Sequence, residues 1–277
     1  QYDPPVCAGL PATQVIGNWD VVPYQTFDGV FQLGVVAFHE EGLDVVFSVN
    51  SSEVARVRNP TWNERTGVYE YWTALTAADY PDGSITVSAF LAPDCPGHEA
   101  RTLETLTLFA NSGGTLTNDS IVWVDCTSGS DDTGDGSESS PYATIEKALV
   151  EVGSGGTVYL KAGLCYELTM IYPPVDFEQW VTVQPAPGVT RAQVQILARS
   201  DSSSTSTGRF AQDMIRWHDV GIYSDTNPGY STVMFFESGH SAWFDGAEIY
   251  EQAGPCNGKV PWAGLEGYQV YMTNTDL

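Results

Sequence analysis

The sequence is poor in basic residues and has no long apolar run. It contains 11 lysines and arginines against 35 aspartates and glutamates, which gives a formal net charge of −24. Because contacts to phosphate groups need lysine and arginine, we expect no binding to nucleic acid, and a polyanionic sugar is a poor ligand unless Ca²⁺ bridges the charges. No stretch approaches the roughly 20 apolar residues that a transmembrane helix needs, so we expect no membrane insertion.

Cysteines at zinc-binding spacing are also missing. None of the five cysteines forms a C-x-x-C pair, which argues against a zinc site, and their wide spacing predicts secreted disulfides. We predict one disulfide in each half of the chain, which leaves one cysteine free, bonded to another chain, or waiting for a partner beyond Leu277. The predicted pairs are Cys7 with Cys95 and Cys126 with Cys165, and the remaining cysteine is Cys256.

Common catalytic signatures do not occur either. The sequence has no G-x-S-x-G, no H-E-x-x-H and no phosphate-binding loop. What it does have is 277 residues of which 42% are hydrophobic, enough for two domains with ordinary cores. Sequons for N-glycosylation begin at Asn50 and Asn118. Together with the disulfides, they predict an extracellular or cell-surface location.

Short strand-like runs separated by turn signals fill the first half. Alternation is clear in the segment 84–92, and turns are indicated by Asn-Pro at 59–60 and Pro-Asp-Gly at 81–83. This spacing predicts an immunoglobulin-like (Ig-like) β-sandwich over residues 1–113. The stretch NPTWNERTGVYEYW resembles Ig-like modules that precede β-helices in large extracellular proteins. The predicted strands are 34–38, 43–49, 54–57, 68–73, 84–92 and 102–110.

Residues 122–167 predict the organisation of the second half. A short strand leads into a Gly/Asp/Ser turn, and apolar residues at 145, 148, 149 and 152 predict a one-sided helix that Gly153 ends. Gly-Gly and the strand 157–160 follow. This order resembles the start of a pectate-lyase-like right-handed parallel β-helix. The resemblance implies an all-β fold over residues 114–277, with one N-terminal capping helix and a carbohydrate-facing extracellular setting.

A second set of strand candidates follows the helix, without a visible C-terminal cap. We therefore expect the β-helix to continue past Leu277. The candidates after the strand 157–160 are 168–172, 180–184, 193–198, 214–217, 233–236 and 268–272.

An internal repeat in this half supplies the candidate catalytic residues. Asp219 and Asp245 are 26 residues apart, as are Trp217 and Trp243, and Asn274 continues the series; one coil has about this length. Carboxylates on neighbouring strands would lie about 4.8 Å apart, near the separation in a retaining glycosidase. The alternative, which we favour, is a ladder of turn residues that bond the backbone.

Arg216 is the candidate base for a lyase, since it lies in a predicted strand beside a histidine. The interpretation that we favour is an ion pair between Arg216 and an aspartate. The sequence also lacks the polygalacturonase-type series of Asn-x-Asp, Asp-Asp, His-Gly and Arg-x-Lys.

Two further patterns concern ligands. Asp131, Asp132 and Asp135 offer oxygen ligands between glycines, so Ca²⁺ is an open alternative there, although we expect a metal-free loop and no cofactor. Exposed aromatic side chains can stack on sugars, and the sandwich half has an aromatic group for which we expect core packing. Its members are Trp62, Tyr69, Tyr71 and Trp72.

Three functions remain open from the sequence. The first, which we favour, is an extracellular structural or adhesive glycoprotein module of a surface filament, appendage or matrix, with like subunits or other extracellular proteins as partners. The second is a secreted polysaccharide lyase or glycoside hydrolase, which only the resemblance implies. The third is a carbohydrate-binding module that uses the sandwich and takes a polysaccharide as partner.

Overall fold

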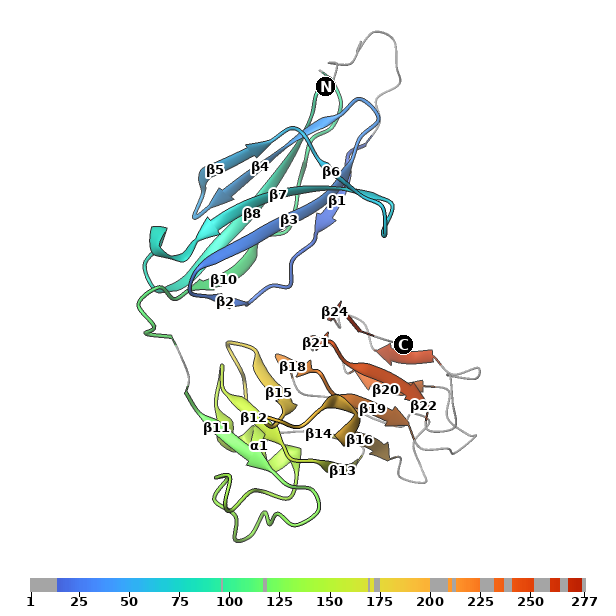
Figure 1. The fold of residues 1–277 in the computed structure, drawn as a ribbon. Coiled ribbons are helices and arrows are strands. Elements are labelled where there is room, and N and C mark those ends of the chain that lie inside the picture. Colours follow the sequence, from blue (N-terminus) through green and yellow to red (C-terminus); the bar gives the residue numbers. More distant parts are fainter. Residues whose placement is uncertain are drawn as a thin grey trace. The chain divides into compact units, whose positions relative to one another are not determined.

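The chain divides into two compact units, Gln1–Thr117 and Asn118–Leu277, in a computed structural model (Figure 1). Both units consist mainly of strands, which confirms the all-β prediction at the level of fold class. The structure describes residues 14–95, 97–116, 119–168, 170–171, 175–199, 209–210, 213–224, 232–236, 241–251, 260–264 and 269–275.

The first unit contains two antiparallel layers. One has the order β1-β3-β7-β6, and the other has the order β2-β10-β8-β4-β5 with β9 paired to β8 and a parallel contact between β2 and β10. The elements are β1 (Ile16–Trp19), β2 (Thr26–Phe27), β3 (Val30–Phe38), β4 (Leu43–Val49), β5 (Ser52–Val57), β6 (Thr61–Asn63), β7 (Val68–Thr76), the 3-10 helix η1 (Ala77–Asp79), β8 (Gly83–Pro93), β9 (Arg101–Thr102) and β10 (Leu106–Ala110).

The alternation predicted in β8 is confirmed. Ile85, Val87 and Ala89 are buried, and they join Leu33 and Val35 of the other layer in one hydrophobic core. The predicted strand 102–110 is divided into β9 and β10, which pair with two different parts of β8.

The prediction that the aromatic group packs in the core is wrong for three of its four members. Only Tyr71 is buried, whereas Trp62, Tyr69 and Trp72 are 49%, 40% and 36% exposed. Trp62 lies on the edge strand β6 directly opposite Tyr69, at the margin of the layer. Trp72 lies on the outer surface over Gly34, where a Cβ would collide with its ring.

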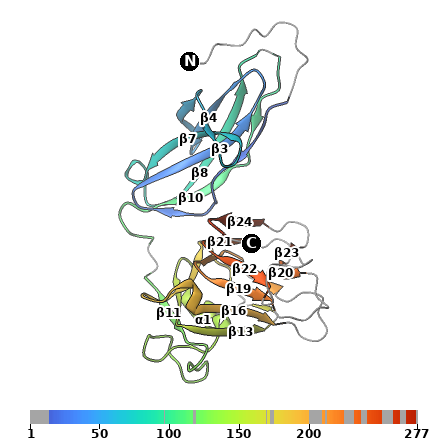
Figure 2. The same cartoon turned by 45° about the vertical axis from the view of Figure 1, so that its right-hand side comes forward.

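The second unit contains three parallel sheets. Successive passes of the chain add strands in the same order, giving β11-β12-β15-β18-β21-β24, β13-β16-β19-β22 and β14-β17-β20-β23. Figure 2 shows the second sheet with its strands one above another. The strands are β11 (Ile121–Val124), β12 (Thr157–Leu160), β13 (Gly163–Leu168), β14 (Met170–Ile171), β15 (Val181–Pro185), β16 (Val194–Arg199), β17 (Arg209–Phe210), β18 (Ile215–His218), β19 (Gly221–Ser224), β20 (Thr232–Phe236), β21 (Ser241–Asp245), β22 (Glu248–Glu251), β23 (Val260–Gly264) and β24 (Gln269–Thr273). The 3-10 helix η2 (Arg191–Gln193) precedes β16.

Apolar side chains stack inside this unit from strand to strand. Within the first sheet, alternate residues point to opposite faces, so one column of residues in register lies entirely inside. Its members are all buried, and each packs on the next strand. They are Val122, Val158, Val183, Trp217 and Phe244.

The predicted helix is confirmed as α1 (Ile145–Val152), with all four predicted apolar residues buried. The hydroxyl of Thr144 accepts a hydrogen bond from the backbone N–H of Lys147 at 3.1 Å, and Gly153 ends the helix with φ of 73°. The helix contacts β11 and β12. Within the described part of the chain, no helix is long and apolar enough to span a bilayer.

The predicted register of the repeat is wrong by one residue. Trp217 lies opposite Phe244, and Asp245 lies opposite His218 instead of Asp219. Trp217 points into the core and needs an apolar neighbour, whereas Trp243 is on the outer face of the sheet. Since a slip of one residue exchanges the two faces, burial selects the observed register.

The predicted strand 168–172 is also displaced. The chain already forms β13 from Gly163 to Leu168, directly after the two-residue turn that follows β12. Residues 170–171 then belong to a different sheet, as β14.

Candidate functional site

Side chains predicted to be catalytic gather on the outer face of the six-stranded parallel sheet. Arg216 on β18 lies opposite Trp243 on β21, and His218 lies opposite Asp245. Thr273 on β24 lies opposite Asp245 on the other side. These side chains belong to outward columns because their neighbours Trp217 and Phe244 point inward.

Asp245 is at the centre of this cluster, and both of its carboxylate oxygens are engaged. Its Oδ2 accepts a hydrogen bond from Nη2 of Arg216, and its Oδ1 accepts one from the hydroxyl of Thr273 at 2.7 Å. Nδ1 of His218 lies 3.2 Å from Oδ2, within ion-pair distance but without hydrogen-bond geometry. One carboxylate therefore links three consecutive strands.

Trp243 completes the cluster. The guanidinium carbon of Arg216 lies 4.3 Å from the Trp243 ring centroid, and the indole Nε1 donates to the hydroxyl of Thr273 at 2.9 Å. The rings of Trp180 and Tyr271 meet edge to face, 6.1 Å apart, and Trp180 lies 5.8 Å from Trp243. We call Arg216, His218, Trp243, Asp245 and Thr273 the Asp245 cluster.

The environment of Asp245 keeps it ionised. Burial raises the pKa of Asp245, but the hydrogen bonds from Arg216 and Thr273 and the nearby positive charge lower it more, so the pKa lies below its usual range. The residue is only 9% exposed. Asp245 is thus a buried, internally neutralised carboxylate.

Asp219 belongs to a different column, in the turn that follows β18. Its φ is 53°, and its backbone N–H donates to the carbonyl of Asp245 at 2.8 Å. The equivalent residues after the next two strands of the sheet, Gly246 and Asn274, also have positive φ, 66° and 52°. Positive φ therefore recurs at Asp219, Gly246 and Asn274, whereas Asp245, a member of the predicted ladder, lies one position earlier in β21 and its carboxylate bonds side chains instead of the turn backbone.

The aspartates proposed as Ca²⁺ ligands organise the loop before α1. The carboxylate of Asp131 accepts from the backbone N–H of Ala143 at 2.8 Å and from the N–H and hydroxyl of Thr144 at 3.1 and 2.8 Å. Asp135 accepts from the backbone N–H of Ser137 at 2.9 Å. Among the residues that the structure describes, no group of three or more His, Cys, Asp or Glu residues is placed to hold a metal ion.

The structure brings Cys126 and Cys165 to disulfide distance, with their Cα atoms 5.1 Å apart. The bond ties the loop after β11 to β13. Cys95 is buried and disulfide-bonded. The predicted Cys7, Cys256 and glycosylation site Asn118 lie outside the described residues.

Asn50 of the other sequon is exposed in the turn between β4 and β5. Its Oδ1 accepts a hydrogen bond from the backbone N–H of Thr86 at 3.0 Å. Glycosylation joins the sugar to Nδ2, so this hydrogen bond and a glycan are compatible.

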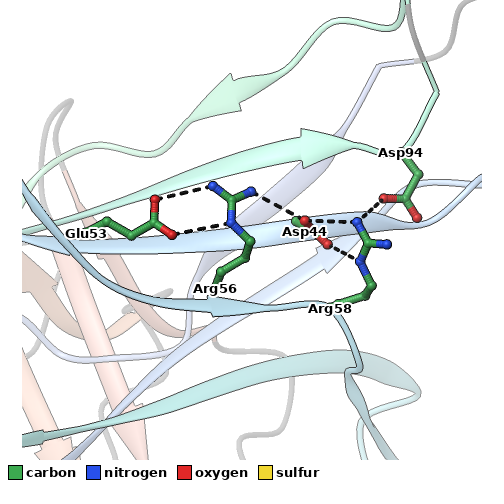
Figure 3. Close-up of polar contacts among 5 residues, drawn as sticks. All are labelled: Asp44, Glu53, Arg56, Arg58 and Asp94. Atoms are coloured by element: carbon green, nitrogen blue, oxygen red, sulfur yellow. Dashed lines mark hydrogen bonds and ion pairs between the residues drawn. The ribbon is translucent and has the colours of Figure 1, made fainter.

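A second charged cluster lies on the outer surface of the sandwich (Figure 3). Asp44 on β4 is flanked by two arginines from the strand β5 and its end. Arg58 donates to both oxygens of Asp44 at 2.8 and 3.1 Å, and Arg56 donates at 3.4 Å. Arg56 also pairs with Glu53, and Arg58 with Asp94. The hydrogen bonds from Arg58 are the main cause that lowers the pKa of Asp44.

Comparisons with known proteins identify no family. No protein-family model and no curated protein matches the chain. Among solved structures, the endo-beta-1,4-mannanase from Thermotoga petrophila aligns with 37% of this chain and 21% of its own, at 10% identity and a TM-score of 0.27. The aligned part is thus about a fifth of that enzyme, and the likeness is too low to carry an argument.

Proposed function

We propose that this chain is an extracellular structural or adhesive module, built from an Ig-like sandwich and a right-handed parallel β-helix. The stacked order of the three parallel sheets supports the β-helix, and the two facing antiparallel layers support the Ig-like unit. In this reading the second unit is a rigid stalk, since each coil rests on the previous one. Its partners are like subunits or other extracellular proteins.

The observation that carries the proposal is the state of Asp245. A glycosidase needs one carboxyl group with a raised pKa to protonate the leaving oxygen, and a second carboxylate beside it. Asp245 instead has a lowered pKa, is buried, and binds Arg216 and Thr273. Its use as an inter-strand link supports a scaffold.

Arg216 is similarly committed. A lyase base must accept a proton, but a guanidinium is protonated at all ordinary pH values and has no acceptor atom. Arg216 here pairs with Asp245 and lies on the Trp243 ring. This arrangement supports a role in packing rather than in proton abstraction.

Electron microscopy of natively isolated material tests the proposal, together with intact mass before and after reduction. Ordered filaments, glycan mass on Asn50 or a reducible cross-link between chains would support an assembly subunit. A monomer without glycan that cleaves a polysaccharide would contradict it.

A further inference from the structure

An exposed apolar row crosses the end of one layer of the first unit. Each strand of the β1-β3-β7-β6 layer contributes one member, so the row follows the order of the strands. Neighbouring strands lie about 4.8 Å apart, a spacing comparable to that of successive sugar rings in an extended chain. The members are Ile16, Phe38, Tyr69 and Trp62, which are 58%, 47%, 40% and 49% exposed. We call them the aromatic row.

The members contact one another. Ile16 lies directly opposite Phe38, and Trp62 lies directly opposite Tyr69. The rings of Phe38 and Tyr69 are nearly parallel, with centroids 6.5 Å apart, and the Trp62 and Tyr69 centroids are 4.8 Å apart. None of the four belongs to the sandwich core. Grouped apolar side chains that stay exposed commonly mark binding sites.

Polar side chains on the opposite face of the hairpin β6–β7 hold Trp62 and Tyr69 in place. Glu70 follows Tyr69 on β7, and its carboxylate accepts from Asn63 Nδ2 at 2.6 Å and from Trp72 Nε1 at 3.1 Å. The amide oxygen of Asn63 accepts from the backbone N–H of Arg65 at 3.0 Å. These bonds fix the hairpin β6–β7 that carries Trp62 and Tyr69.

We propose that the aromatic row binds an extended neutral polysaccharide, a β-1,4-linked hexose or pentose chain. The flat C–H faces of such sugars stack on aromatic rings. The net charge of −24 disfavours an anionic polysaccharide and a second copy of this chain. A row of four side chains is also far smaller than the roughly 20–30 residues per side of a stable protein interface. This inference is independent of the role proposed for the second unit.

Affinity measurements on the full chain test the row. Retention is measured on insoluble cellulose, mannan and xylan, and titration calorimetry is done with their soluble hexasaccharides. The variants are Trp62→Ala and Tyr69→Ala, with Trp62→Phe as the conservative change. Phe90→Ala is the matched control, because Phe90 is 43% exposed on a strand of the other layer. Circular dichroism verifies that each variant folds.

The expected result is binding to at least one of these neutral glycans, weakened about tenfold by either alanine variant, as one lost stacking contact implies. Trp62→Phe should retain most of the affinity, and Phe90→Ala all of it. Three results would overturn the proposal. The first is no binding to any of the three glycans. The second is an equal loss of affinity in Phe90→Ala and Trp62→Ala. The third is that the alanine variants change only a concentration-dependent self-association of the chain.

Discussion

Replacing Asp245 by asparagine should destabilise the second unit without disturbing its shape. The amide keeps the size of the side chain and can still accept from Thr273 through Oδ1. It removes the charge that Arg216 faces, and a hydrogen bond to a charged group contributes about 1.5–3 kcal/mol. The Arg216 side chain is 30% exposed, so water solvates part of the uncompensated charge. We therefore expect a loss of about 2 kcal/mol, within these limits.

This loss should be visible as a lower melting temperature. For a domain of about 150–250 residues, 1 kcal/mol shifts Tm by roughly 2–4 °C, so the variant should melt roughly 4–8 °C lower. A thermal melt of a two-unit chain does not show which unit a stability change belongs to. Hydrogen exchange of individual amides locates it. Amides of β21 and β24 should exchange faster, because Asp245 links these strands to β18.

The control is Glu178→Gln, which removes an exposed carboxylate from the same unit. It should leave Tm and exchange unchanged. An Asp245→Asn variant with the same Tm as the control, and with β21 amides that exchange at the parent's rate, would refute this reasoning. In that case the Asp245 cluster does not hold the strands together.

Three other changes have defined outcomes. Asp44→Asn should cost about 1 kcal/mol at pH 7, since the arginines beside it are half exposed. Arg58 lowers the pKa of Asp44 in the folded state, so the carboxylate stabilises the fold at pH values above its unfolded pKa of about 3.9. This stabilisation is lost as the pH falls through the lower folded pKa. The free energies of unfolding of variant and parent, measured by urea titration, should therefore converge below about pH 4. Gly246→Ala should cost about 1–2 kcal/mol in thermal melts through its φ of 66°, while Gly29→Ala, with no atom within 4 Å of the new Cβ, should be nearly neutral; equal effects would exclude backbone strain. Thr144→Ala should cost about 1 kcal/mol by removing the cap of α1, and unchanged exchange at the first turn of α1 would contradict this.

Local patterns predicted the elements well. The helix follows from apolar residues at 145, 148, 149 and 152, a spacing that only a helix can bury on one face. The strand β8 follows from strict alternation, and β12 matches its predicted bounds of 157–160. These features depend on neighbours along the chain, which a sequence displays directly.

The register between β18 and β21 could not be predicted from similar tripeptides. Trp217-His218-Asp219 and Trp243-Phe244-Asp245 look alike, yet one tryptophan is inside and the other outside. What fixes the register is the need to cover Trp217 with another apolar side chain. The residue types at 219, 246 and 274 were a usable signal for the register. Asp, Gly and Asn are the residues that tolerate positive φ, and all three positions have it.

The Asp245 cluster was predicted only in part. Arg216 and Asp245 were each candidates, and an ion pair of Arg216 with an unspecified aspartate was favoured, but Thr273 was missed, since it lies 28 residues from Asp245 and belongs to no motif. The exposure of Trp62 and Tyr69 was missed for a related reason. An aromatic residue in a strand reads the same whether it lies over the core or at the margin of its sheet.

Cleavage of polysaccharides tests the central claim most directly. The full chain and its Asp245→Asn variant should be incubated with acidic and neutral polysaccharides and assayed for new reducing ends and unsaturated products. We predict no product from either protein, because the carboxylate of Asp245 is buried, ionised and bound to Arg216 and Thr273. Turnover by the parent chain that disappears in the folded Asp245→Asn variant would contradict it and identify Asp245 as catalytic.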